Sequence, residues 1–343
     1  MPFVSDIVKY DSLSIVGLEK NTGKTEALNY ILRRLPSTGA KLAVTSIGID
    51  GEQRDQVTRT PKPEITLFPG MIFSTAESYY RERRLLSNLL DISDEESSMG
   101  RILSAEVIRS GKVLLAGPSS TQGLQRWMKR MGAFGADLKI VDGALSRLSL
   151  ASPAVSSAMI LSTGAAYSAE MNTLVNKTKF IVELISAPLA EDKTIGKLDG
   201  VGNGIWGIDE SGEVFNITKK SSLLLANLKG DFLSRSSVVY VAGALTDAFL
   251  RILNNSKGSR ELELIVDDFT KVFATEQEYR LFLRRGGRVK VMKRSKLIAV
   301  CVNPTAPNGY VLDSDILCRK LEEAIHLPVY DIVKNRYIYS RYI

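Results

Sequence analysis

The stretch that decides the fold is Ser14-Ile-Val-Gly-Leu-Glu-Lys-Asn-Thr-Gly-Lys-Thr25. A short apolar run ends at Gly17, and an amphipathic segment from Glu26 to Leu35 follows the Gly-Lys-Thr sequence. This order of strand, loop and helix suits a phosphate-binding loop, because the loop N–H groups and the positive end of the helix attract phosphate oxygens. We therefore predict a nucleoside triphosphate site. The alternative is an ordinary glycine-containing turn between a strand and a helix.

The motif gives its residues separate tasks. Lys24 reaches the terminal phosphates, and the hydroxyl of Thr25 faces Mg²⁺. Five residues rather than four separate Gly17 from Gly23, and Leu18 stands where the usual motif has its first glycine. The expected cofactors are ATP and Mg²⁺. The residues predicted to bind the nucleotide are Lys20, Asn21, Thr22, Gly23, Lys24, Thr25 and Glu26.

Composition favours a cytoplasmic globular protein. Of the 343 residues, 44% are hydrophobic and 24% charged, which is ordinary for such proteins. No apolar run approaches the roughly 18 residues needed to span a bilayer, and the N-terminus lacks the basic and apolar regions of a signal peptide. Cys301 and Cys318 have no metal-binding spacing, so we expect reduced cysteines and no membrane partner.

The net charge of +7 raises the question of nucleic acid binding. Basic residues cluster at 81–84, 126–130, 284–294 and 334–341, each beside apolar residues on an expected helix or hairpin. This pattern favours solvated faces, and no recognition-helix or single-strand-binding signature accompanies it. A basic surface equally suits an acidic protein partner. Nucleic acid is therefore not the expected partner.

Apolar runs alternate with amphipathic stretches along the whole chain, which predicts an α/β fold with a mixed, mostly parallel sheet flanked by helices. Residues 102–108 and 112–117 are expected to form a hairpin around Ser110-Gly-Lys112. Thr275 and Glu278 form a capping box at a helix start. The expected strands are 13–17, 42–47, 65–68, 102–108, 112–117, 138–142, 157–162, 180–186, 238–243, 262–266, 288–293, 297–302 and 328–333. The expected helices are 24–35, 75–90, 120–132, 166–177, 244–254, one beginning after Thr275, and 313–325.

A glycine-rich region divides the chain into three expected parts. Residues 1–190 form the P-loop nucleotide-binding domain, 191–235 a β insertion or linker, and 236–343 a C-terminal α/β region. Residues 141–146 are similar in sequence to residues 241–246, but the second half of the chain has no Gly-Lys-Thr. Chance similarity and a duplicated half both remain open.

Two carboxylates are candidates for the catalytic acid beside Lys24. Ligands of open α/β sheets bind at the carboxyl ends of strands, and Asp50 follows the next strand after the phosphate loop. We expect that strand to be its neighbour, so Asp50 is predicted to join Thr25 at the metal. The strand ending at Gly117 carries no acid, so Asp142, on the following strand, is the other candidate. Each is alternatively a simple turn residue.

Other polar loops are less informative. Ser119, Ser120 or Thr121 either caps the next helix or touches a phosphate or substrate. Residues 162–166 open another helix, and 303–309 form a polar loop that either recognises a base or effector or connects two elements. The only histidine, His326, ends a helix, so a Ser-His-Asp triad or a histidine metal site is not expected.

The spacing of Gly17 and Gly23, with Asp50 after the second strand, resembles the dethiobiotin-synthetase-like branch of P-loop NTPases. In deviant members a signature lysine stands five residues before the P-loop lysine, but Glu19 occupies that position. The resemblance therefore does not imply a lysine that reaches across a dimer interface, and homo-oligomerisation stays open.

Three segments, 16–25, 46–51 and 140–147, together resemble the larger, phosphate-loop subunits of lysine 5,6-aminomutase reactivases. The resemblance implies an ATPase that services an adenosylcobalamin-dependent enzyme of lysine fermentation. Such a chaperone would release damaged cobalamin, with the aminomutase subunits and a small companion subunit as partners. The alternatives are an ATP-dependent ligase or small-molecule kinase of the dethiobiotin-synthetase type, and a non-catalytic nucleotide-binding scaffold.

Overall fold

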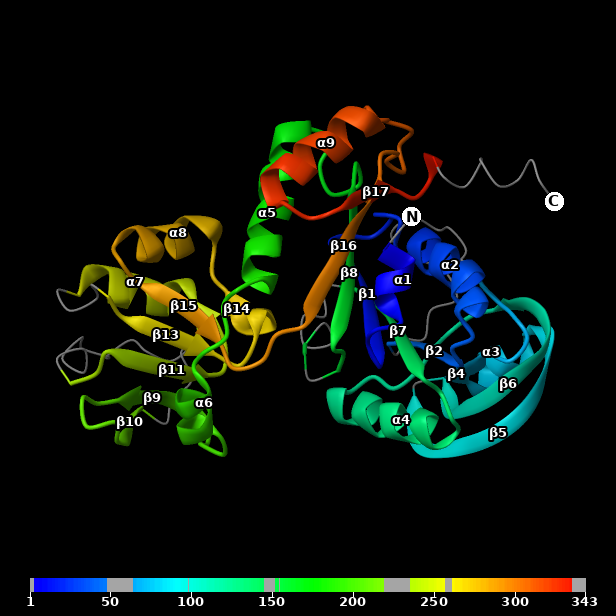
Figure 1. The fold of residues 1–343 in the computed structure, drawn as a ribbon, viewed down its shortest axis with the longest axis horizontal. Helices are drawn as coiled ribbons and strands as arrows, with labels where there is room; N and C mark the ends of the chain where they lie inside the picture. The colour runs from blue at the N-terminus through cyan, green and yellow to red at the C-terminus, as the bar shows by residue number, and fades with distance from the viewer. Residues whose placement is uncertain are drawn as a thin grey trace. The chain divides into compact units, whose positions relative to one another are not determined.

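The computed structural model describes residues 3–47, 64–97, 99–144, 152–153, 155–218, 235–256 and 261–334. The chain divides into two compact units, Met1–Lys179 with Ser295–Ile343, and Phe180–Arg294. Helix α5 (Met171–Ile185) runs across the first division. Each unit has its own sheet (Figure 1).

The first unit contains a ten-stranded, largely parallel sheet in the order β17-β16-β8-β1-β7-β2-β4-β6-β3, with β5 paired to β6. Neighbouring strands from β17 to β4 are parallel, whereas β6 is antiparallel to β4, β3 and β5. Its strands are β1 (Ser12–Gly17), β2 (Leu42–Ser46), β3 (Ile65–Leu67), β4 (Ile72–Ala76), β5 (Arg84–Ser97), β6 (Gly100–Val113), β7 (Leu138–Ala144), β8 (Ala158–Gly164), β16 (Lys296–Asn303) and β17 (Val329–Asp331).

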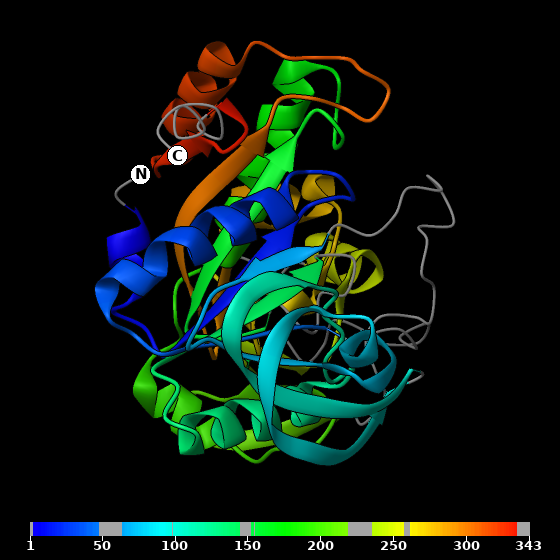
Figure 2. The ribbon, with the colours of Figure 1, turned by 90° about the vertical axis from the view of Figure 1, so that its right-hand side faces the viewer.

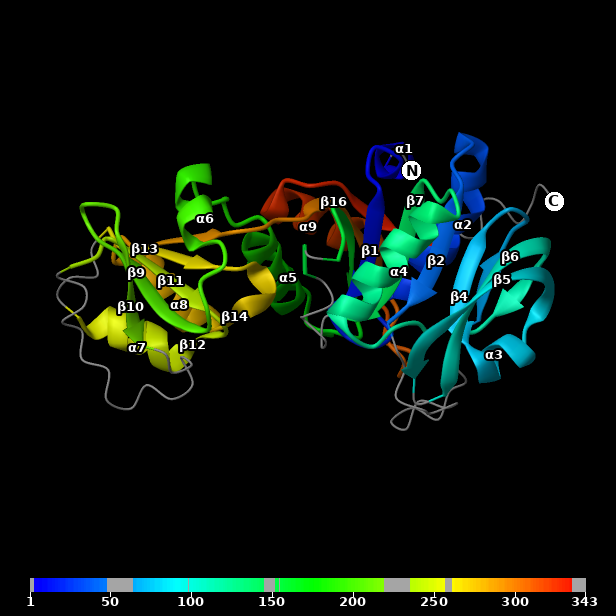
Figure 3. The same ribbon diagram turned by 90° about the horizontal axis from the view of Figure 1, so that it is seen from below.

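Helices cover both faces of this sheet. Its described helices, besides α5, are α1 (Phe3–Ile7), α2 (Lys24–Arg34), α3 (Glu77–Arg81), α4 (Thr121–Ala133) and α9 (Ser314–Ile325). Leu28 and Ile31 of α2 belong to one buried cluster with Ile15 of β1. Trp127 and Met131 of α4 belong to another, on the face opposite to Ile15 (Figure 3). The apolar stripe of each helix therefore fixes it against the sheet.

The second unit contains a five-stranded sheet in the order β10-β9-β11-β13-β15, in which β11, β13 and β15 are parallel. Tyr240 and Ile265 lie in its buried core, and β9 and β10 form an antiparallel hairpin. Its strands are β9 (Gly204–Ile208), β10 (Val214–Thr218), β11 (Val238–Ala242), β12 (Leu245–Thr246), β13 (Glu263–Val266), β14 (Val272–Phe273) and β15 (Arg288–Val291). Its helices are α6 (Asp192–Leu198), α7 (Asp247–Asn255) and α8 (Glu276–Arg284).

Three expected elements are wrong. The predicted helix 75–90 ends at Arg81, and β5 begins at Arg84. The predicted hairpin 102–117 is one long strand, β6, which pairs with β5 in a strongly bent ribbon (Figure 2). The predicted strand 180–186 is the end of α5. Strand pairing and helix packing outweigh local propensity at these places.

The two compact units differ from the three parts that the sequence predicts. Strands β16 and β17 return to the sheet of the first unit, since β16 pairs with β8 from Lys296 to Asn303. The C-terminal region therefore contributes to two units rather than forming one. Within the described part of the chain, no helix combines the length and apolar character that crossing a membrane requires.

Candidate functional site

The candidate phosphate-binding site is the six-residue connection from β1 to α2. Strand β1 is buried along its whole length and ends at Gly17, and α2 begins at Lys24. Asn21 and Gly23 have left-handed backbones, with φ of 63° and 90°. Successive turns of this kind let a loop curl so that its N–H groups point inward, which is the backbone arrangement of anion-binding loops.

Hydrogen bonds within the loop, and from strands β8 and β16 on one side of β1, hold this loop in place. The Thr22 hydroxyl donates to the backbone oxygen of Glu19 at 2.8 Å, and the Leu18 N–H donates to Ser162 O at 2.9 Å. From the end of β16, the Asn303 side-chain amide donates to Asn21 O at 3.0 Å. One bond within the loop and one bond from each of two strands, β8 and β16, thus fix the path of the loop.

Both motif glycines are required by their surroundings. A Cβ at Gly17 would lie 2.8 Å from the Thr22 hydroxyl oxygen. At Gly23 it would lie 2.9 Å from the Cβ of Asn303 and 3.1 Å from a methyl carbon of Ile332, in addition to the left-handed backbone. A side chain at Gly23 would therefore force the loop away from β16.

The ammonium of Lys24 lies 3.2 Å from Oδ1 of Asp142, which projects from β7. This oxygen is buried and accepts no hydrogen bond from any described residue. The two side chains are 26% and 13% exposed, so they form a partly buried ion pair. The Asp142 carboxylate can still accept a hydrogen bond or bind a metal ion. Because the ion pair with Lys24 is its one interaction with the described residues, this acceptor can take a further cation or donor that arrives with a ligand.

The N-terminal end of α2 has no side-chain cap among the described residues, because its N-cap is Gly23. Its first N–H groups therefore keep their capacity to bind an external acceptor. One carboxylate already enters the loop: Oε1 of Glu19 accepts the backbone N–H of Lys20 at 2.9 Å. A bound phosphate would have to displace this acid.

Two groups, one after β8 and one on β16, have raised pKa values. Burial, followed by the charge of Glu19, raises the pKa of Tyr167. On the neighbouring β16, burial raises the pKa of the Cys301 thiol to about 12. Both groups are therefore neutral near pH 7 and act here as packing groups.

The structure brings most of the predicted site residues together. Residues 20–26 form the loop and the first turn of α2, and Asp142 meets Lys24. Asp50 lies outside the described residues. The expectation that its strand neighbours the phosphate loop is wrong: β7 lies between β1 and β2, pairing with both. Strand β7 pairs with β1 and β2 across a long sequence separation, so no local sequence pattern indicates this strand order.

The other predicted loops have mixed outcomes. Ser120 caps α4, since its hydroxyl accepts the Gly123 N–H at 3.0 Å, which confirms the capping interpretation. His326 ends α9 in a left-handed conformation, as its place in the sequence suggested. Asn303 belongs to the polar loop 303–309, which the sequence assigns either to recognition of a base or effector or to a plain connection, and its side-chain amide binds Asn21 of the β1–α2 loop. Its position directly after an apolar strand was the available signal.

No described group of three or more His, Cys, Asp or Glu side chains is arranged to hold a metal ion alone. A divalent ion at this loop would need ligands from Thr25, Asp142 and a bound phosphate, which is the oxygen-rich shell that Mg²⁺ prefers. Comparisons with protein-family models, with curated proteins and with solved structures find no match to this chain.

Proposed function

We propose that this chain binds Mg²⁺·ATP at residues 20–26 and hydrolyses it. The observation that carries the proposal is the Lys24–Asp142 ion pair at the N-terminus of α2, which has no side-chain cap. The loop before it contains the left-handed residues Asn21 and Gly23. A cation, a carboxylate and the N–H groups of a helix N-terminus are the three elements needed to hold a metal-bound triphosphate.

The residues fit a magnesium ion. Oδ1 of Asp142 is a buried oxygen without a hydrogen bond from any described residue, and the Thr25 hydroxyl lies in the first turn of α2. Bound there, the ion would neutralise phosphate charge. Lys24 would leave Asp142 for the phosphates, and the loop N–H groups would hold the oxygens in place. The same exchange would couple nucleotide binding to the position of β7.

The proposed role of the ATPase is chaperone-like reactivation of an adenosylcobalamin-dependent aminomutase, by exchange of damaged cobalamin. Its support is the resemblance of segments 16–25, 46–51 and 140–147 to reactivase subunits. A nucleotide-dependent change at the loop would then be transmitted to a protein client, as in other nucleotide switches.

The test combines two assays. Purified protein should hydrolyse ATP slowly and only with Mg²⁺. Together with a small companion subunit and Mg²⁺·ATP, it should restore turnover of lysine 5,6-aminomutase that holds inactivated cobalamin, once free adenosylcobalamin is added. A Lys24→Ala variant is the matched control and should restore nothing. Metal-dependent hydrolysis without reactivation would support the proposed ATPase activity but contradict the proposed protein client. If neither hydrolysis nor reactivation is found, the whole proposal is wrong.

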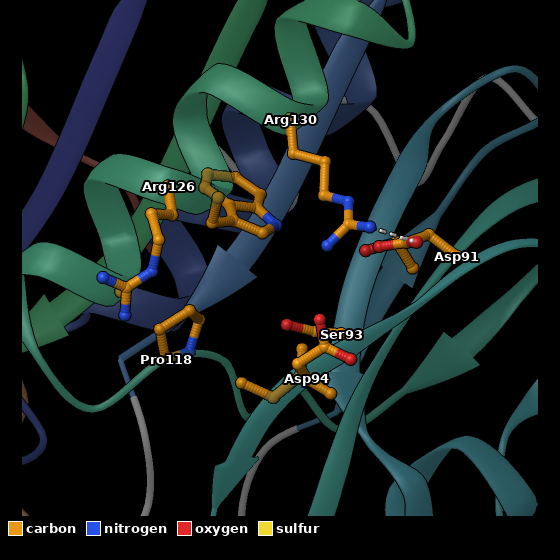
Figure 4. A pocket seen from close by; sticks show the side chains of 10 residues that line it. Asp91, Ser93, Asp94, Pro118, Arg126 and Arg130 are labelled. Carbon is orange, nitrogen blue, oxygen red and sulfur yellow. Dashed lines mark ion pairs between the residues drawn. The ribbon is translucent and has the colours of Figure 1, made fainter.

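The second candidate, an ATP-dependent ligase or small-molecule kinase, is favoured by one observation. A cavity lined by charged side chains lies at the edge of the sheet where β2 and β4 end (Figure 4). A metabolic enzyme would consume ATP rapidly only with its acceptor, whereas a reactivase would respond to its protein client.

A further inference from the structure

Asn303, the last residue of β16, is anchored through both its backbone and its side chain. Its backbone oxygen accepts the Ala165 N–H at 3.0 Å. Gly164 of β8 lies so close that a Cβ on it would be 2.0 Å from the same oxygen. In the side chain, Oδ1 accepts the Thr305 N–H at 3.1 Å. The place and the orientation of the Asn303 side chain are therefore fixed by the protein itself.

The other polar atom of this side chain is directed at the phosphate loop. Nδ2 of Asn303 donates to the backbone oxygen of Asn21 at 3.0 Å. The C=O and N–H groups of a trans peptide point in opposite directions. The bond that holds the Asn21 oxygen toward β16 therefore turns the Thr22 N–H away from β16. A single side chain of β16 thus sets the orientation of a peptide group in the middle of the loop.

Asn21 is the residue of the loop whose backbone needs this support. Its φ is 63°, in the left-handed region. Asparagine adopts that region more readily than most residues, but unlike glycine it does so at a steric cost. Gly23 has the same handedness without the cost. A hydrogen bond from a fixed donor to the Asn21 oxygen offsets the cost and keeps the loop curled.

The sequence leaves a second role open for the polar loop 303–309, namely recognition of a base or an effector. For Asn303 the contacts favour support of the phosphate loop over recognition of a base. Its side-chain Oδ1 and Nδ2 each have a partner within the protein already. A base would have to compete with these partners or share them.

We propose that Asn303 is a positioning residue of the phosphate loop. It holds Asn21 in the left-handed conformation and so prepares the loop for phosphates, without touching the nucleotide. The inference rests on the proposed nucleotide site at residues 20–26. A prepared loop binds more tightly because less ordering free energy is lost when the ligand arrives. The gain is the same for every ligand that carries the phosphates, whatever its base.

The test compares two asparagines of the same polar loop. In each, the side-chain Oδ1 accepts the N–H two residues on, at 3.1 Å for Asn303 and 3.2 Å for Asn308. Within the described part of the chain, Asn303 donates to the phosphate loop and Asn308 does not. In calorimetric titrations, Asn303→Ala should weaken binding of Mg²⁺·ATP, Mg²⁺·GTP and Mg²⁺·tripolyphosphate by the same factor, about five- to tenfold. Asn308→Ala should leave all three affinities unchanged.

A second substitution, Asn21→Gly, tests the role of the left-handed backbone. Glycine adopts this conformation without a steric cost, so Asn21→Gly should restore most of the affinity that Asn303→Ala loses. In the wild-type background it should change the affinity by less than about twofold. Circular dichroism and thermal melting check that each variant is folded. If Asn303→Ala does not fold, Asn303→Ser takes its place, because its shorter side chain also loses the contact with Asn21.

Hydrogen exchange without any ligand tests the loop itself. Backbone amides of residues 18–23 should exchange about fivefold faster in Asn303→Ala than in the wild type or in Asn308→Ala. Three results would overturn the inference: a loss of affinity for one nucleotide but not for tripolyphosphate, a loss that Asn21→Gly does not reduce, or equal exchange in the two asparagine variants. If the wild type binds none of the three probes, the proposed nucleotide site is wrong, and the exchange rates still decide whether Asn303 holds the loop.

Discussion

Helices α2 and α4 both begin at the edge of the sheet where the parallel strands end, yet their first turns differ. In α4 the Ser120 hydroxyl accepts the Gly123 N–H at 3.0 Å, so the protein satisfies its own helix start. In α2 the N-cap is Gly23, which has no side chain to offer. A cap contributes about 1 kcal/mol to stability. We infer that α2 forgoes this contribution because its N–H groups serve an external anion.

The backbone supports the same contrast. The loop before α2 contains left-handed residues at Asn21 and Gly23, whereas Ser120 has an ordinary extended backbone. Left-handed geometry costs energy for residues other than glycine, and sites that bear such strain are often functional. The proposed nucleotide site accounts for this difference: Ser120 stabilises the start of α4, whereas the start of α2 is left to the ligand that we propose.

The largest expected effect comes from Gly23→Ala. The new Cβ would meet Asn303 and Ile332 in a left-handed backbone, so we expect a loss of about 2–4 kcal/mol of stability. Nucleotide binding should be abolished. Gly39→Ala is the control, since Gly39 has φ of 77° but nothing within 4 Å of the added atom. It should cost about 1 kcal/mol and leave binding intact in chemical denaturation and calorimetry.

Asp142→Asn should reduce Mg²⁺-dependent hydrolysis about ten- to a hundredfold while nucleotide still binds, because the metal loses an anionic partner. Strand β7 is the neighbour of β1, so Asp50→Asn should have the smaller effect. A steady-state ATPase assay of both variants decides between them. If Asp50→Asn is the inactive one and Asp142→Asn turns over normally, the acid is assigned to the wrong strand.

Ser120→Ala sharpens the comparison from the other helix. Removing the hydroxyl leaves the Gly123 N–H without its cap, which should cost about 1 kcal/mol of unfolding free energy. Nucleotide affinity should not change. Urea denaturation and a binding titration on the same sample test both statements, and a large loss of affinity would show that α4 also serves the nucleotide.

The smallest effect is expected from Glu19→Gln, and it has the opposite sign. The Glu19 carboxylate accepts the Lys20 N–H in the loop and competes with phosphate for it. Neutralising this exposed acid should raise nucleotide affinity about two- to fivefold at low salt, and less at high salt. Weaker binding by this variant would mean that Glu19 supports the loop rather than competing with the ligand.

The strand, loop and helix of the candidate site could be predicted from the sequence because their signal is local. The order of β1, loop and α2 lies within residues 12–34, and apolar periodicity with Gly-Lys-Thr determines it. The order of the strands in the sheet has no such local signal. Strand β7 enters between β1 and β2 by pairing across more than a hundred residues, for which no local pattern exists. The Asp142 contact with Lys24 followed from that pairing.

The misassigned elements have the same origin. The second half of the predicted helix 75–90 contains four leucines, which favour a helix, but these residues belong to β5, which is stabilised by pairing with β6. Residues 180–185 are rich in β-branched and aromatic side chains, yet they continue α5, in which Val182 and Ile185 are buried. The role of Asn303 was equally hidden, because its partner Asn21 is distant in sequence.

The most direct test of the central claim is calorimetric titration of Mg²⁺·ATP into the wild-type chain and into Lys24→Ala. The account predicts one saturable site in the wild type and a loss of about ten- to a hundredfold or more in the variant, because a charge-assisted contact with the phosphates is removed. Circular dichroism should show both proteins folded. Equal affinity in a folded Lys24→Ala variant, or no binding by the wild type, would contradict the account.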